Sequence, residues 1–89
     1  MAESYTVTIK LISQDRPCFA GHKVGDEWTF DGQLPAGICP SAWYAIYPYL
    51  LTMANGGAFP WQDDPNVNVI SCPDHLVHNT FELRRAPRE

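Results

Sequence analysis

The sequence predicts a small α+β domain, an antiparallel-rich sheet in the order β-β-α-β-β with one kinked helix packed on it. Apolar and polar residues alternate near both ends of the chain, which is the pattern of half-buried strands. In the middle, apolar residues recur at three- and four-residue steps, which is the pattern of a helix with one buried face. Because 89 residues support only one core and neither a repeat nor a linker is visible, we expect a single domain over 1–89.

The first two strands are expected over Tyr5–Ile12 and Val24–Phe30. In the first, every second residue is apolar, so one face is buried and the other meets water. In the second, Trp28 and Phe30 share a face. That strand should end at Asp31-Gly32, because this dipeptide is a strong turn signal.

The helix is expected from Pro40 to Asn55, because proline suits its first turn and Gly56-Gly57 suits its end. Pro48 interrupts the pattern, since it lacks a backbone donor and crowds the preceding turn. A kink near residues 44–48, or two short helices, should result. The apolar residues of the expected core face are Ala42, Trp43, Ile46, Leu50, Met53 and Ala54.

The last two strands are expected over Val67–Cys72 and Thr80–Arg85, the second with Phe81 and Leu83 facing the core. One short helix should leave half of the sheet uncovered. A small core and a surplus of aromatic residues favour self-association, so we expect a homo-oligomer.

Charge and hydropathy exclude two classes of partner. Six basic residues against ten acidic ones give a net charge of −4, which does not suit binding to phosphate backbones, so no nucleic acid is expected. Arg84, Arg85 and Arg88 should form a solvated chain end. No apolar run reaches the ~20 residues of a membrane span, and no signal peptide is visible, so we expect no membrane and a cytoplasmic protein.

Three cysteines are the most distinctive residues. Their odd number, without a secretion signal, favours free thiols or metal ligands over a disulfide framework. Each one has a proline neighbour and lies at the end of an expected element, where functional groups are common. Three thiolates and one imidazole suit zinc or iron. The candidate ligands are Cys18, His22, Cys39 and Cys72.

Other interpretations of these residues stay open. Buried cysteines often act as small apolar side chains. At the start of a helix, however, the Cys39 thiol is expected to face the first-turn amides, which favour a thiolate, so Cys39 and His22 are candidate catalytic acid–base or nucleophilic groups. Whether His75 and His78 take part is open, because both lie in an expected loop.

Aromatic residues crowd around the helix and the segment that follows it. A short helix has one buried face, so some rings must point elsewhere and could line a pocket for a flat organic ligand. The expected lining residues are Trp43, Tyr44, Tyr47 and Trp61.

The chain resembles a family of short prokaryotic proteins without an assigned activity. The resemblance implies a shared cysteine framework and no particular reaction. It rests on Cys18-x-x-Gly21-His22-Lys23-x-Gly25-Asp26, Gly37-Ile38-Cys39-Pro40-Ser41-Ala42, Tyr47-Pro48-Tyr49, Gly56-Gly57, Pro60-Trp61 and Cys72-Pro73-Asp74.

Three functions therefore remain. The first is a small metal-binding protein with an aromatic-lined pocket, extending to metal-assisted chemistry on a small organic molecule. The second is a metal-free isomerase or lyase that uses Cys39 and His22. The third is a non-catalytic partner subunit that docks through its aromatic surface.

Overall fold

The computed structural model describes residues 5–15, 21–71 and 79–87. Its elements follow the expected order β-β-α-β-β, which confirms the α+β class. They are β1 (Tyr5–Gln14), β2 (Glu27–Phe30), α1 (Pro40–Ala54), β3 (Val67–Ser71) and β4 (Asn79–Pro87).

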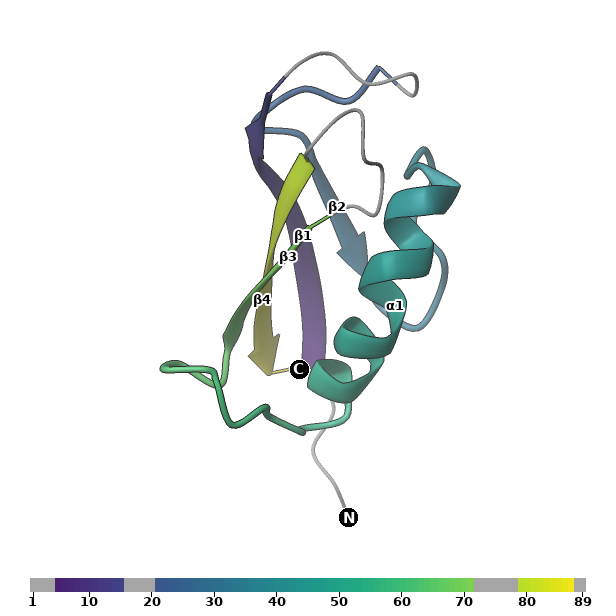
Figure 1. The fold of residues 1–89 in the computed structure, drawn as a ribbon. Coiled ribbons are helices and arrows are strands. Elements are labelled where there is room, and N and C mark those ends of the chain that lie inside the picture. The colour runs from purple at the N-terminus through teal and green to yellow at the C-terminus, as the bar shows by residue number, and fades with distance from the viewer. Residues whose placement is uncertain (1–4, 16–20, 72–78, 88–89) are drawn as a thin grey trace.

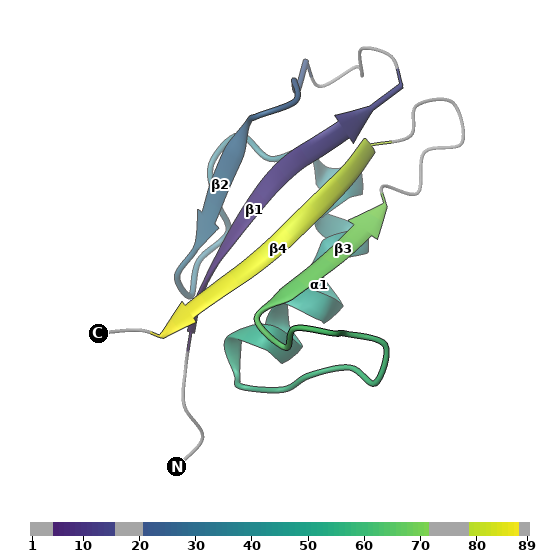
Figure 2. The ribbon, with the colours of Figure 1, turned by 90° about the vertical axis from the view of Figure 1, so that its left-hand side faces the viewer.

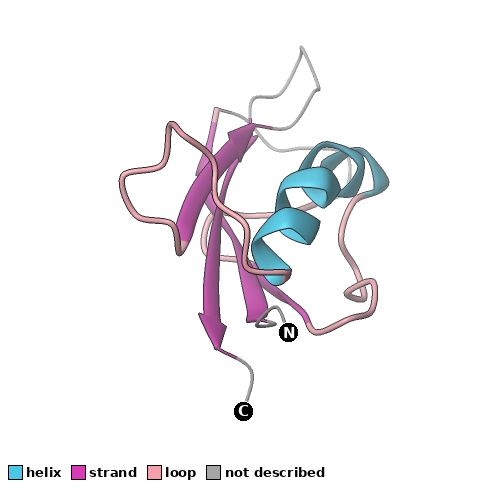
Figure 3. Cartoon of the chain, turned by 90° about the horizontal axis from the view of Figure 1, so that it is seen from below, coloured by secondary structure: helices cyan, strands magenta, loops and turns pink. Residues whose placement is uncertain are grey.

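The four strands form one sheet in the spatial order β2-β1-β4-β3, and every neighbouring pair is antiparallel (Figure 2). The first and last strands of the chain are therefore the two central ones. The helix α1 lies across one face of this sheet (Figures 1 and 3). The core forms between them and uses the apolar positions that alternate along the strands. Its buried residues are Val7, Ile9, Leu11, Phe30, Ala42, Ile46, Leu50, Met53, Ala54, Phe81 and Leu83.

The other face of the sheet is mostly polar. Strand alternation places Thr6, Thr8 and Lys10 of β1 on it. The register sets Lys10 opposite Glu27 on one neighbouring strand and opposite Glu82 on the other. Opposite charges facing each other across strands stabilise a sheet that meets water on this side. The uncovered half of the sheet thus lacks the large apolar surface that would drive association.

The free edge of β3 is largely covered by the protein itself. The Val67 N–H donates to the Asp64 carbonyl at 3.1 Å, and the Gln62 side-chain amide donates to the Val67 carbonyl at 2.8 Å. The Val69 N–H donates to the side-chain oxygen of Asn68 at 2.9 Å. Because an unpaired edge invites another strand, these bonds disfavour pairing along β3.

The helix runs without interruption from Pro40 to Ala54 with Pro48 inside it, so the alternative of two short helices is wrong. It ends as expected at the two glycines, where Gly56 has a φ of 87°. The Gly57 N–H donates to the Thr52 carbonyl at 2.9 Å, which closes the last turn as a Schellman motif. Among the described residues, no helix has the length and apolar character needed to span a membrane.

The bounds of three strands differ from those expected, and β4 extends over Asn79–Pro87 rather than Thr80–Arg85. The second strand begins at Glu27 rather than Val24, because Gly25 adopts a φ of 99° and breaks the extended run. The first strand continues to Gln14 past a register shift between Leu11 and Ser13, which is typical of a β-bulge.

Arg85 is not part of a solvated chain end, and that expectation was wrong for this residue. Only 8% of Arg85 is exposed. Its Nη1 donates to the carbonyls of Met53, at 3.1 Å, and Gly57, at 2.6 Å, and its Nε donates to the Asn66 side chain at 3.0 Å. The guanidinium also lies 4.5 Å from the ring centre of Tyr5. It therefore neutralises the partial negative charge at the helix C-terminus. Arg84 is exposed, as expected, and Arg88 lies outside the described residues.

Candidate functional site

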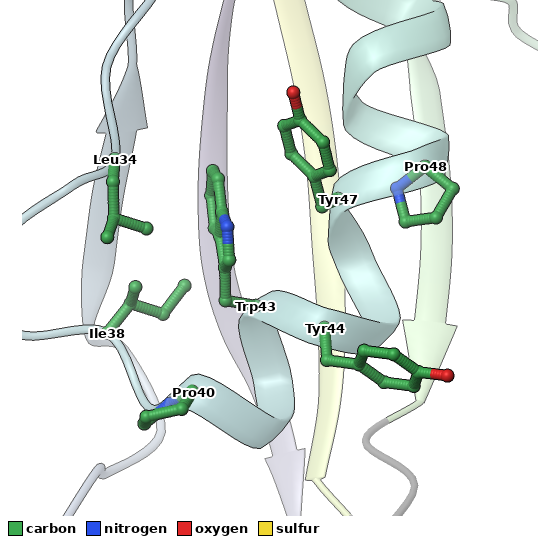
Figure 4. Close-up of a pocket in the computed structure, with 7 residues that line it drawn as sticks. All are labelled: Leu34, Ile38, Pro40, Trp43, Tyr44, Tyr47 and Pro48. Carbon is green, nitrogen blue, oxygen red and sulfur yellow. The ribbon is translucent and has the colours of Figure 1, made fainter.

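A groove of about 450 Å³ lies along the N-terminal half of α1. Five of its lining residues come from the helix and two from the segment that joins β2 to the helix (Figure 4). The lining residues are Leu34, Ile38, Pro40, Trp43, Tyr44, Tyr47 and Pro48.

Helical spacing brings the groove residues together. Pro40, Tyr44 and Pro48 follow one another at four-residue steps and so share one stripe of the helix. Trp43 and Tyr47 form the neighbouring stripe, with ring centres 5.2 Å apart. In Figure 4, the Trp43 ring stands on the side of Leu34 and Ile38, whereas Tyr44 and Pro48 project to the other side of the helix.

The groove is partly preformed because its central ring is fixed by the core. The ring of Trp43 lies 6.0 Å from that of Phe30, which is buried on β2. The outer walls, by contrast, are open to solvent, since Leu34 is 63% exposed and Tyr44 is 79% exposed. Large apolar side chains this exposed, gathered in one place, are typical of a binding surface.

Next to the groove, the backbone of Cys39 meets the side chain of His22. The Cys39 N–H donates to His22 Nε2 at 3.0 Å, across 17 positions of the chain. His22 is 8% exposed, and its ring packs edge-on against Trp28 at 4.7 Å. Its carbonyl accepts a hydrogen bond from the Gln14 side chain at 2.9 Å. The lone pair of Nε2 is therefore occupied by the Cys39 N–H. Because a neutral imidazole has one protonated nitrogen, its hydrogen then lies on Nδ1.

The Cys39 thiol is free, half-buried and packed against the core. Cys39 precedes the first helical residue, but its side chain makes no capping hydrogen bond. The expected contact between this thiol and the first-turn amides is therefore not formed. Cys39 does lie between Ile38 and Pro40, which both line the groove.

Two of the four expected metal ligands, Cys18 and Cys72, lie outside the described residues, as do His75 and His78. Within residues 5–15, 21–71 and 79–87, no three His, Cys, Asp or Glu side chains form a group that could hold a metal ion. The described part of the chain brings together only His22 and Cys39, and the four-ligand set stays a prediction.

The four expected pocket residues divide between two places. Trp43, Tyr44 and Tyr47 line the groove, whereas Trp61 lines a separate cavity of about 350 Å³ beside β3. Trp61 stacks on Phe59 with ring centres 4.6 Å apart, and its Nε1 donates to the Asn68 side chain at 3.4 Å.

Four groove residues were not expected from the sequence: Leu34, Ile38, Pro40 and Pro48. The spacing of Pro40 and Pro48 about Tyr44 could have identified the two prolines, because all three share a helix stripe. Leu34 and Ile38 had no such signal, since the path of their loop depends on the tertiary fold.

No protein-family model, no curated protein and no solved structure matches the chain. The proposed function therefore rests on the geometry of the site.

Proposed function

We propose that this protein binds a small, uncharged, aromatic organic molecule in the groove along α1. The observation that carries the proposal is the lining, which contains three aromatic rings, two prolines and two aliphatic side chains but no charged group. A charged ligand would lose hydration there without gaining an opposite charge. A flat apolar ligand would instead cover exposed rings by stacking.

The size of the groove supports a ligand of this kind. Its volume of about 450 Å³ falls within the range of roughly 300–1,000 Å³ that is typical of small-molecule sites. Trp43, held against Phe30, supplies a fixed platform, so a ligand that stacks there need not order the ring on binding. Tyr44 is mostly exposed and loses apolar contact with water when a ligand covers it.

The test is a titration of the dilute protein with indole and with the charged analogue indole-3-acetate, followed by the NMR signals of the tryptophan side chains. Indole should perturb Trp43 and bind more tightly than indole-3-acetate. Tyr44→Ser should weaken indole binding, whereas Trp61→Ser, which changes an exposed ring outside the groove, should leave it unaltered. Saturable binding that is lost in Trp61→Ser but kept in Tyr44→Ser would contradict the proposal.

A second candidate is binding of zinc or iron by Cys18, His22, Cys39 and Cys72. The hydrogen bond between His22 and the Cys39 amide favours it, because it brings two of these four residues together. The same bond sets a condition. The Cys39 N–H and a metal would compete for one lone pair on Nε2, so His22 could ligate through this atom only after releasing the amide.

Elemental analysis of protein purified without chelator or affinity metal tests this candidate. A stoichiometric metal that is lost in both Cys39→Ser and His22→Gln would support it, and a metal-free wild-type protein would contradict it.

The half-buried free thiol of Cys39 agrees with the reducing environment of the cytoplasm, which is where we propose that the protein acts.

The metal-free acid–base alternative meets the same obstacle. His22 could act as a base through Nε2 only after the Cys39 amide had left it. No contact among the described residues favours this alternative over binding alone.

A further inference from the structure

The helix stripe that lines the groove also contains a backbone carbonyl that has lost its usual partner. In an α-helix, the carbonyl of residue 44 would accept a hydrogen bond from the N–H of residue 48. Residue 48 is proline, which has no N–H. Among the side-chain hydrogen bonds of the described residues, the nearby Thr52 hydroxyl donates to the Pro48 carbonyl, at 3.0 Å, and none reaches the Tyr44 carbonyl.

The position of this carbonyl makes it relevant to a ligand. Residues four apart lie on the same helix face, so the Tyr44 carbonyl points along the stripe toward Pro48. Both residues are exposed and both line the groove (Figure 4). The remaining wall is apolar apart from the tips of the aromatic side chains. An acceptor on this stripe is thus placed to give the groove directional selectivity.

We propose that the Tyr44 carbonyl selects the ligand by accepting a hydrogen bond from it. The preferred ligand class is then an uncharged, planar aromatic molecule that carries an N–H or O–H donor at its edge. This inference rests on the proposed function and specifies its ligand. Pro48 is the specificity-determining residue, because it removes the N–H from which this carbonyl would otherwise accept a hydrogen bond.

Matched probe pairs test the inference. Indole and 1-methylindole have the same ring system, but only indole offers an N–H, and phenol and anisole form a second pair. The wild-type protein should bind the donor-bearing member of each pair about fivefold more tightly, as one neutral hydrogen bond provides. Pro48→Ala restores an N–H to the helix and removes one apolar lining side chain, so it should weaken both members of a pair and bring the ratio of their affinities close to one.

A spectroscopic readout observes the carbonyl directly. Tyr44-Ala45 is the only Tyr-Ala pair in the sequence, so labelling tyrosine with carbonyl ¹³C and alanine with ¹⁵N isolates the Tyr44 carbonyl as a single correlated NMR signal. Indole should shift this carbon resonance, and 1-methylindole should leave it nearly unmoved. If Pro48→Ala distorts the groove and binds neither probe, these two wild-type measurements still decide the question.

The outcomes separate this inference from the proposed function. Two results would overturn selection by this carbonyl and leave the groove as an aromatic site. One is equal affinity of the wild-type protein for indole and 1-methylindole, and the other is an unshifted Tyr44 carbonyl resonance at saturation with indole. Retention of the preference in a folded Pro48→Ala protein overturns it as well. If no probe of either pair binds, the proposed function fails and this inference fails with it.

Discussion

At the scale of single residues, two buried polar side chains hold segments that are distant in the sequence. Arg85 joins β4 to the end of α1 and to Asn66, and no carboxylate among the described residues pairs with it. Its charge is met by backbone carbonyls and by the face of Tyr5. His22 holds the residue before the helix through a single acceptor atom.

We expect Arg85→Lys to destabilise the fold by ~2 kcal/mol. The single ammonium group of lysine cannot replace the planar guanidinium, whose Nε and Nη1 donate to Asn66, Met53 and Gly57. Urea unfolding followed by circular dichroism measures the change. Arg84→Lys is the matched control, because Arg84 is exposed and its Nε donates to the Glu82 carboxylate at 3.2 Å. It should shift stability by less than ~0.5 kcal/mol. Equal effects of the two variants would show that Arg85 has no special role.

We expect His22→Phe to cost ~1–3 kcal/mol, because it leaves the partly buried Cys39 N–H without its acceptor. His22→Gln should cost less, since its side-chain oxygen can take the place of Nε2. Thermal unfolding gives the ranking, and the Cys39 amide resonance reports on the bond itself. A His22→Phe protein as stable as the wild type would show that ring packing against Trp28, and not the hydrogen bond to the Cys39 N–H, holds His22 in place.

At the scale of elements, α1 combines a stabilising end with a destabilising interior. Its C-terminus is closed by Gly56, Gly57 and Arg85. A Cβ at Gly57 would lie 2.6 Å from the Thr52 side chain, so the close approach there requires glycine. Pro48, on the exposed stripe of the same helix, removes one backbone hydrogen bond without an evident packing gain.

We expect Pro48→Ala to raise stability by ~1–3 kcal/mol, because alanine restores the missing donor and favours the helix. For a domain of this size, each kcal/mol corresponds to roughly 4–8 °C in Tm. Pro40→Ala is the control, since proline is well tolerated in the first turn, where its N–H has no helical partner. A Pro48→Ala protein that melts at or below the wild-type temperature would show that the helix accommodates this proline without cost.

At the scale of the whole molecule, the surfaces differ in their capacity for association. The uncovered face of the sheet is mostly polar, and the edge of β3 is covered by a hydrogen bond that the Gln62 side chain donates and by one that the Asn68 side chain accepts. The other edge strand, β2, has only four residues. The exposed large apolar residues Leu34, Tyr44 and Tyr47 instead gather at the groove.

We therefore predict that any self-association uses the groove. Sedimentation of the wild-type protein at micromolar concentration should show a dimer, since exposed apolar side chains gain by burial between copies. The double variant Leu34→Ser and Tyr44→Ser should be monomeric, whereas Val24→Ser, which changes a residue that is 58% exposed away from the groove, should behave like the wild type. A wild-type protein that is monomeric throughout this range would exclude the predicted homo-oligomer.

The sequence by itself determined the element order, the glycine end of the helix and the core face of α1 apart from Trp43, which is only partly buried and lines the groove. These features are local. The periodicity of apolar residues sets the elements and the buried face of the helix, and the ability of glycine to adopt a positive φ sets the end of the helix. It also identified three groove aromatics, because a helix of one buried face cannot hide Trp43, Tyr44 and Tyr47 together.

Only the tertiary structure decided which strands became central, where Arg85 points and which loop closes the groove. Arg85 and Met53 are 32 positions apart, and nothing in the charge pattern of the C-terminal segment distinguishes buried Arg85 from exposed Arg84. The bond between His22 and the Cys39 amide likewise depends on how the loop before α1 packs beside β2. Such contacts are fixed by the three-dimensional register of separate elements, which no local pattern of residues encodes.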